Sequence, residues 1–311
     1  VLEIDHSRTI ISRNSSPDVP FDRSVNPYRG CEHGCIYCYA RPTHAWLGLS
    51  PGLDFERRLF YKPHAARQLR AELAARDYAC APMGLGANTD AYQPVERRLG
   101  VTREILQVLA GCDHPVRIVT KSALVERDLD LLEPMAAKRL CTVCISVTTL
   151  DPKLARRMEP RANAPARRLL AIRRLSERGI PVGVLAAPMI PALNDAELES
   201  ILCAAYEAGA RSASYSVLRL PLEIKTLFKE WLAEHEPLKA THVMQRVRDM
   251  RGGREYDPDF SQRMHGRGIY ADLLARRFEL YRTRLGYRPE PDLETRLFAP
   301  PRPESDQLDL F

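Results

Sequence analysis

Short apolar runs alternate with amphipathic stretches from residue 24 to residue 236 of the chain. The apolar runs predict β-strands at 83–87, 116–120, 142–148, 182–187 and 214–220, after a first strand that begins near Ser24. The amphipathic stretches predict helices at 65–78, 102–111, 126–137, 165–179, 195–209 and 222–234. Because the strands are apolar along their whole length, both faces of their sheet should be buried. The pattern therefore predicts an α/β fold, a partial parallel β/α barrel of about six units.

The alternation stops near residue 237, where two further helical patterns follow, at 238–250 and 270–285. From residue 287 onward the chain is polar and rich in proline, which predicts an extended and mobile segment. We therefore divide the chain into an N-terminal segment (1–23), the barrel (24–236), a helical C-terminal extension (237–286) and a flexible tail (287–311).

The composition is typical of a soluble enzyme, with 45% hydrophobic and 28% charged residues. The net charge of +6 comes mostly from arginine, which indicates either contact with phosphate or nucleic acid or a codon bias towards arginine. The N-terminal residues lack the apolar core of an export signal, and no apolar run is long enough to span a bilayer. We therefore expect a cytoplasmic protein without membrane contact, whose 8 cysteines are not paired in disulfides.

Three cysteines, Cys31, Cys35 and Cys38, come directly after the first predicted strand. Loops that follow barrel strands line the catalytic face, and thiolates are ligands for zinc or iron–sulfur clusters. Their spacing differs both from the paired cysteines of structural zinc modules and from the four cysteines of ferredoxins. Three cysteines on a [4Fe–4S] cluster would leave one iron open to a substrate. A zinc site completed by His33 or His44 is the alternative.

The stretch "CEHGCIYC" resembles the C-x3-C-x-aromatic-C motif of the radical S-adenosylmethionine (SAM) superfamily, with Tyr37 in the aromatic position. The resemblance implies a partial or full β/α barrel in which the amino and carboxylate groups of SAM bind the fourth iron. It also implies that an electron from the cluster cleaves SAM into methionine and a 5′-deoxyadenosyl radical, which abstracts hydrogen from a substrate. An electron donor such as flavodoxin or ferredoxin is an expected partner.

More of the chain, roughly residues 24–220, is similar to the spore photoproduct lyase-like branch of this superfamily. The segments that carry the similarity include "NPYRGCEHGCIYCYAR", "GANTDAYQPVE", "SVTTLD" and "PMIPALND". The resemblance implies that residues at the strand ends contact SAM, its amino group after the second strand, its carboxylate after the third and its ribose after the fourth. The candidates are Tyr37, Asn88, Thr89, Asp90, Lys121, Ser122, Ser146 and Arg161. A turn or cap role for Thr89 and Ser122, and a solvated charge for Lys121, remain open.

One departure from that branch concerns the hydrogen donor. Spore photoproduct lyases use a cysteine in the stretch equivalent to residues 86–90, where this chain has none. We therefore do not carry over thymine-dimer repair. Tyr92, Tyr215 and Cys144 are the candidate donors here, and Cys144 shares a strand face with Ser146. Cys141 should point to the opposite face from Cys144, so these two should not bind one metal.

A group of arginines, interleaved with aromatic residues, lies in the long loop between the last two predicted helices. A basic groove with stacking rings suits a flipped base or a single strand. The candidates for nucleic-acid contact are Arg254, Tyr256, Arg263, His265 and Arg267. The arginines between residues 156 and 174 are more simply a solvated helix face.

The chain ends in "QLDLF", which resembles the Q-L-x-L-F peptide by which bacterial replication and repair proteins bind the sliding clamp. In this interpretation Leu310 and Phe311 fill an apolar pocket, Gln307 makes a polar contact, and Leu308 completes the peptide. A tail that folds back onto the protein, or a chance match, is the alternative.

Together these features predict a radical SAM enzyme that modifies or repairs DNA and is recruited by the sliding clamp. Radical modification of RNA or protein is the first alternative. A zinc-stabilised nucleic-acid adaptor without catalysis is the second.

Overall fold

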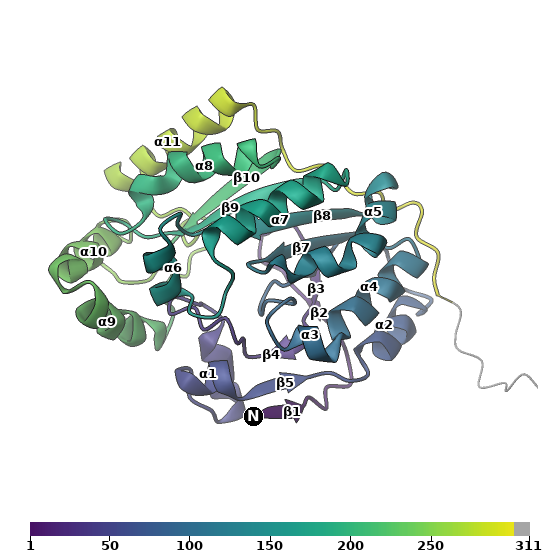
Figure 1. Ribbon diagram of the computed structural model, residues 1–311. Coiled ribbons are helices and arrows are strands. Elements are labelled where there is room, and N and C mark those ends of the chain that lie inside the picture. The colour runs from purple at the N-terminus through teal and green to yellow at the C-terminus, as the bar shows by residue number, and fades with distance from the viewer. Residues whose placement is uncertain (302–311) are drawn as a thin grey trace, which may run out of the picture.

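The computed structural model describes residues 1–301, which form a curved sheet covered by helices on its outer face (Figure 1). The sheet has seven strands in the order β10-β9-β8-β7-β6-β3-β2. All are parallel except β2, which pairs antiparallel with β3. The strands are β2 Ile11–Arg13, β3 Arg23–Val25, β6 Met83–Leu85, β7 Val116–Thr120, β8 Cys141–Ser146, β9 Val182–Met189 and β10 Ser212–Val217. The predicted partial parallel barrel is therefore confirmed.

The helices that follow the strands also agree with the sequence pattern, within a few residues at their ends. They are α2 Ala65–Leu73, α4 Val101–Gly111, α5 Leu129–Ala137, α7 Pro165–Glu177, α8 Leu198–Glu207, α9 Ile224–His235, α10 Pro237–Asp249 and α11 Ile269–Leu285. The first turns of two predicted helices are instead 3-10 helices, η2 Ala123–Asp128 and η3 Asp195–Glu197. Within residues 1–301, none of the helices is long and apolar enough to cross a membrane.

A second, small sheet was not predicted. It consists of β1 Leu2–Ile4, β5 Leu59–Tyr61 and β4 Tyr28–Arg29, in that order. The short elements η1 Arg41–Leu47, α1 Leu53–Arg57, α3 Glu96–Leu99 and α6 Pro152–Met158 were also missed. Elements this short carry too few residues to show a hydrophobic period, so a sequence pattern does not detect them. The segment before the cysteines is β4, which leaves the large sheet and pairs with β5 instead.

Both faces of the large sheet were predicted to be buried, but their surroundings differ, because one face lines a cavity. On β7, Val116 belongs to the buried core, whereas Arg117 and Val119 line a cavity on the inner face. Neighbouring β8 repeats this pattern, because Val143 is in the core whereas Cys144 lines the cavity. The inner face of the curved sheet therefore encloses a site rather than a packed core.

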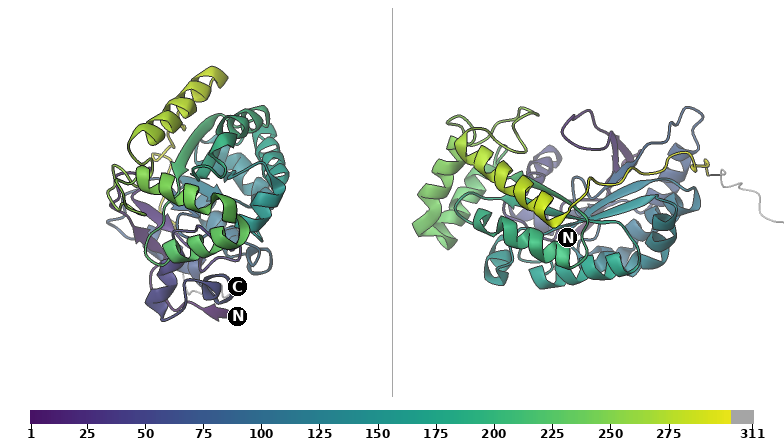
Figure 2. Two further views of the ribbon diagram at one scale, coloured as in Figure 1. Left: turned by 90° about the vertical axis from the view of Figure 1, so that its left-hand side faces the viewer. Right: turned by 90° about the horizontal axis from the view of Figure 1, so that it is seen from above.

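The open side of the curved sheet is bridged by one ion pair. Asp18 lies in the connection from β2 to β3, at one edge of the sheet. Arg263 lies in the loop between α10 and α11, next to Met264, whose carbonyl accepts from the backbone N–H of Val217 in β10 at the other edge. The guanidinium Nη2 of Arg263 donates to Asp18 Oδ1 at 2.6 Å. In the view from above, both loops project from the same side of the molecule (Figure 2).

Residues 287–299, which we call the strap, cross the N-terminal ends of the strands. The Arg288 N–H donates to the Arg211 carbonyl before β10, and the Glu294 N–H donates to the Arg139 carbonyl before β8. Phe298 packs its ring on His114 and Tyr78, with ring centroids 5.3 and 5.6 Å apart. The strap has no helix or strand, as expected of an extended segment, but these contacts contradict the prediction that it is mobile. The "QLDLF" peptide lies outside the described residues.

Candidate active site

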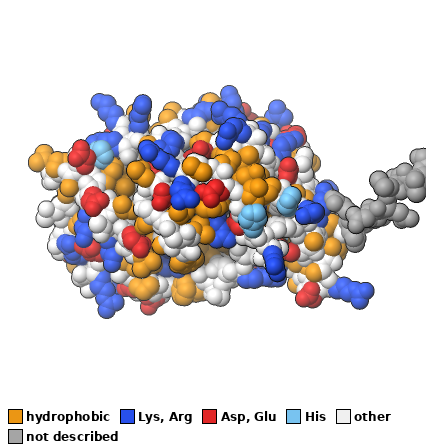
Figure 3. Space-filling model, turned by 90° about the horizontal axis from the view of Figure 1, so that it is seen from below, with side chains coloured by type: hydrophobic (Ala, Val, Ile, Leu, Met, Phe, Trp, Pro, Cys, Tyr) orange, Lys and Arg blue, Asp and Glu red, His pale blue; other side chains and the backbone are white. Residues whose placement is uncertain are grey.

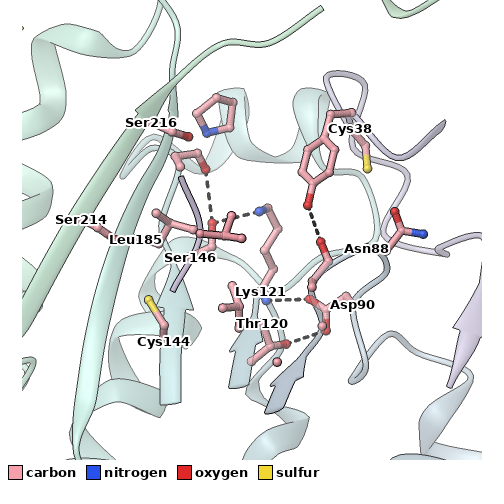
Figure 4. Close-up of a pocket in the computed structure, with 18 of the residues that line it drawn as sticks. Cys38, Asn88, Asp90, Thr120, Lys121, Cys144, Ser146, Leu185, Ser214 and Ser216 are labelled. Atoms are coloured by element: carbon pink, nitrogen blue, oxygen red, sulfur yellow. Dashed lines mark hydrogen bonds between the residues drawn. The ribbon is translucent and has the colours of Figure 1, made fainter. Parts of the chain in front are cut away.

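A cavity of about 500 Å³ occupies the inside of the curved sheet. The cysteine loop lies at its upper end, where the strands finish, and Arg117 lies at its lower end together with Glu290 of the strap. Figure 4 shows Lys121, Ser146 and Cys144 on neighbouring strands facing this space. Its size and enclosure are those of a small-molecule site.

The cysteine loop is held in shape by a buried arginine. Arg41 is 1% exposed and donates from Nε to the Cys35 carbonyl at 2.9 Å and from Nη2 to the Gly34 carbonyl at 3.0 Å. The Cys31 N–H donates to the Phe55 carbonyl of α1 at 2.9 Å, so the short helix α1 also holds the loop in place. All three thiols, those of Cys31, Cys35 and Cys38, consequently face one cavity.

Burial disfavours the thiolate form of Cys31 and Cys35 unless a cation accompanies it. Burial, with repulsion from Glu159, raises the pKa of Cys35 to about 12. Burial and the nearby Asp90 also raise the pKa of Cys31 well above its usual value. Iron ions stabilise thiolates, so the donor set has the chemistry that a cluster requires.

Both histidines that the zinc alternative would use have other partners. Among residues 1–301, no three His, Cys, Asp or Glu side chains come close enough together to hold one metal ion. Ligands of one zinc would have to lie within about 4 Å of each other, given Zn–S bonds of about 2.3 Å. Of the two proposed zinc histidines, His44 instead bonds the Arg58 carbonyl at 2.9 Å, and His33 lies 3.3 Å from Asp90. The arrangement therefore does not support the zinc alternative.

Within the cysteine loop, Tyr37 belongs to a buried polar network. Its hydroxyl donates to the Glu159 carboxylate, which also accepts from Thr148 at 2.7 Å and pairs with the Arg168 guanidinium. Burial opposes ionisation of Glu159, but the charges of Arg168 and Lys121 lower its pKa to about 2. Arg168 is 2% exposed, so its assignment to a solvated helix face was wrong. Sequence reasoning missed Glu159 because a lone carboxylate carries no motif.

Asp90 connects the ends of β6 and β7. Its carboxylate accepts from the Thr120 hydroxyl at 2.7 Å and from the Lys121 N–H at 2.7 Å. Burial alone would raise its pKa, but the charge and hydrogen bond of His33, together with these donors, lower it to about 2. Asp90 therefore orders the cavity wall as an ionised acceptor. Asn88 and Thr89, which precede it, also line the cavity.

Lys121 extends along the cavity rather than into solvent. Its amine donates to the Ser146 hydroxyl at 2.9 Å and lies 5.8 Å from the centre of the Tyr37 ring. Ser146 in turn donates to the Ala187 carbonyl of β9 at 3.2 Å (Figure 4). A cation held here faces the same space as the thiols, which suits an anionic group such as a carboxylate.

Three of the predicted residues do not face the cavity. Ser122 caps η2 by accepting from the Leu124 N–H at 3.2 Å, which is the alternative role left open for it. Arg161 is 43% exposed and pairs with Glu56 on the outer side of the cysteine loop. Tyr92 is fully buried, and its hydroxyl donates to Asp128 at 3.1 Å within the core. The structure therefore does not bring Ser122, Arg161 and Tyr92 together with the residues that line the cavity.

The other two donor candidates do line the cavity. Cys144 faces it from β8, as its shared parity with Ser146 predicts, and burial raises its pKa to about 12. Tyr215 reaches it as well, although its ring packs on Phe278 at 4.7 Å between centroids. Other cavity residues were not predicted, since nothing in their local sequence marks them, among them Arg117, Ser214, Ser216 and Glu290.

Of the candidate nucleic-acid residues, one lines the cavity and the others lie in the same loop. His265 lines the cavity, whereas Arg254 and Arg267 are exposed nearby in the same loop and Tyr256 is half-buried. Arg263 is not free for phosphate, because it forms the bridge to Asp18 described above. Arg219, which was not predicted, lines the cavity with its guanidinium 4.5 Å from the Tyr39 ring centre.

Comparison with known protein families agrees with this geometry. Residues 25–204 match the family model of the radical SAM superfamily, so the chain belongs to that superfamily. It is a radical SAM enzyme, and its cofactors are a [4Fe–4S] cluster and SAM. The predicted fold class, enzyme class and cofactors are thereby confirmed.

Individual relatives and solved structures resemble this chain over most of its length. An uncharacterised protein of Mycobacterium tuberculosis is 34% identical over 276 residues, covering 88% of this chain and 78% of that protein. Among solved structures, a spore photoproduct lyase with bound AdoMet and dinucleoside spore photoproduct has a TM-score of 0.63 at 15% identity, covering 93% of this chain and 79% of that one. Streptococcus suis SuiB bound to S-adenosylmethionine has a TM-score of 0.52 at 14% identity, covering 84% and 47%. At such identities the likeness concerns the fold.

Proposed function

We propose that this enzyme uses radical chemistry to modify or repair DNA. The observation that carries the proposal is the position of the three thiols in a cavity whose lining also includes Arg219 and the half-exposed ring of Tyr39. The solved lyase with the similar fold holds a dinucleoside photoproduct, which supports a nucleic-acid substrate.

Each side chain then has a defined part. Cys31, Cys35 and Cys38 would hold the cluster, and Lys121 would pair with the carboxylate of SAM. When bound, these cofactors supply a 5′-deoxyadenosyl radical for hydrogen abstraction. Asn88 offers an amide oxygen to the ammonium group, and Ser146 offers a hydroxyl to the ribose. Cys144, inside the cavity, is placed to return a hydrogen atom to a substrate radical.

The mouth of the cavity provides contacts for a phosphate backbone. Arg219 lies against the half-exposed ring of Tyr39, and Arg254 and Arg267 are exposed in the adjacent loop. A guanidinium beside an aromatic ring suits a phosphate next to a stacked base. By contrast, the face seen from below carries blue side chains interrupted by acidic and hydrophobic ones (Figure 3). We therefore place the nucleic-acid contacts at the mouth rather than on that face.

The substrate class is tested by label transfer. The reduced enzyme, supplied with electrons by flavodoxin, ferredoxin or dithionite, is incubated with SAM and with deuterated single-stranded or damaged DNA. We expect deuterium in the 5′-deoxyadenosine, measured by mass spectrometry, because the radical takes the substrate's hydrogen. Deuterated RNA and deuterated protein are run in parallel. Label from either of these and not from DNA would replace the proposal with the corresponding alternative.

Recruitment by the sliding clamp is a separate part of the proposal. Residues 307–311 carry the peptide, and the strap anchors the chain before it by Phe298. Deleting residues 307–311 should abolish capture by an immobilised clamp and leave SAM cleavage unchanged, since the cavity ends at the strap. A variant with Asp309→Ala, which keeps Gln307, Leu310 and Phe311, is the matched control and should still bind. Equal capture of the deleted and full-length chains would contradict the clamp interpretation.

A further inference from the structure

The lower end of the cavity is closed by three polar side chains, which we call the floor: Arg117 of β7, Thr142 of β8 and Glu290 of the strap. The Thr142 hydroxyl donates to Glu290 Oε1 at 2.6 Å, and Arg117 Nη1 lies 2.5 Å from the same oxygen. Arg117 and Glu290 both line the cavity. The strap therefore contributes a charged side chain to the inside of the barrel.

The floor retains unused hydrogen-bonding capacity. The Nε of Arg117 is buried and has no hydrogen-bond partner among residues 1–301. A buried donor without a partner is unfavourable, because it has lost its hydrogen bonds to water and has formed none within the protein. An ion pair that served merely to attach the strap would not need to face the cavity, and the strap is already attached through backbone bonds of Arg288 and Glu294. These observations point to a ligand that completes the floor.

The floor and the predicted SAM contacts lie at opposite ends of the same cavity. Arg117 lies on β7 and Lys121 directly follows this strand; both line the cavity, and they are four residues or about 13 Å apart. Between them the walls are apolar or small. Phe21 lies against Gly84, where an added Cβ would come within 3.1 Å of the ring, and Val119 and Leu185 face the same space. Apolar walls above a polar floor suit a flat ring that carries polar groups on one edge.

We propose that the floor binds the polar edge of one nucleobase turned into the barrel, an inference that rests on the proposed nucleic-acid function. Arg117 donates to an acceptor on the base edge, and Glu290 accepts from a neighbouring N–H. Each base carries such adjacent acceptors and donors, whereas a phosphate or carboxylate would be repelled by Glu290. The chemical class that fits the floor is therefore a neutral heterocycle with both kinds of group.

The test measures binding by the SAM-loaded holoenzyme under anaerobic conditions. The probes are short fluorescent DNA strands that are abasic at every position except one, which carries adenine, cytosine, guanine or thymine, and a fully abasic strand. We expect at least one base to raise the affinity about 10-fold over the abasic strand, the size of a base-edge contact. Arg117→Gln and Glu290→Gln should each remove most of this gain and leave the affinity for the abasic strand, the iron content and SAM binding unchanged.

Arg254→Gln is the matched control, because an arginine that contacts phosphate should affect all five strands equally. The proposal is overturned if no base adds affinity, or if Arg117→Gln and Glu290→Gln retain the gain. If Arg117→Gln loses iron, the proposal is judged from the base-dependent gain in affinity of Glu290→Gln and Thr142→Val. Because this assay measures binding alone, a failure of the floor remains distinct from a failure of label transfer.

Discussion

Replacing Cys35 by alanine is expected to abolish SAM cleavage. The variant should be purified with almost no iron, against about four iron ions per wild-type chain. Cys35 is one of three thiols that face the cavity, and among residues 1–301 no other cysteine lies in this loop to replace it. Iron is measured by a colorimetric assay and 5′-deoxyadenosine by chromatography after anaerobic reduction.

Cys203→Ala and Cys144→Ala are the controls. Cys203 lies on α8, on the outer side of the sheet, so its loss should change neither measurement. Cys144→Ala should retain iron and SAM cleavage, because Cys144 lies on β8 away from the cysteine loop, and should affect the fate of the substrate radical alone. Full iron and normal SAM cleavage in Cys35→Ala would contradict the assignment of the cluster ligands.

Replacing Glu159 by alanine is expected to lower the free energy of unfolding by about 3–5 kcal/mol, the usual cost of leaving one charge of a buried pair without its partner. Glu159 and Arg168 have side chains that are 0% and 2% exposed, so the guanidinium would remain buried and uncompensated. The change also removes the acceptor of the Tyr37 hydroxyl. Urea unfolding of the two proteins under anaerobic conditions measures the difference.

The pH dependence of this effect provides an internal check. The folded-state pKa of Glu159 is lowered from 4.5 to about 2, so its stabilisation is present above pH 4.5 and is lost as the pH falls towards 2. The double variant Glu159→Leu/Arg168→Met should lose less stability than Glu159→Ala, because neither charge remains buried. If Glu159→Ala and the wild type unfold at the same urea concentration, the pair is not a stabilising element.

The parts of the site that were predictable from sequence are local. Cys31, Cys35 and Cys38 lie within eight positions, so their spacing alone constrains their chemistry. The floor could not be predicted, because Arg117 and Glu290 are far apart in sequence and meet through the path of the strap. Arg161 was misplaced because its side chain turns outward to pair with Glu56, which depends on packing against the cysteine loop.

The large sheet was predictable for a similar reason. Strands such as β7 and β8 are flanked by long amphipathic helices, so two independent periodicities agree. What the pattern did not reveal is that residues of β7, β8, β9 and β10 line a cavity. Val119 and Leu185 are apolar although they line it, so hydrophobicity does not separate the inner face from the core.

The Asp18–Arg263 bridge has a consequence for how a long polymer reaches the cavity. The first and last strands of the sheet are joined on this side by side chains, not by backbone pairing. Separating one pair of charges would open a lateral slit, through which an internal stretch of a strand could enter sideways without its end being threaded. Ions in solution weaken such a bridge, so access from the side should be easier at high salt.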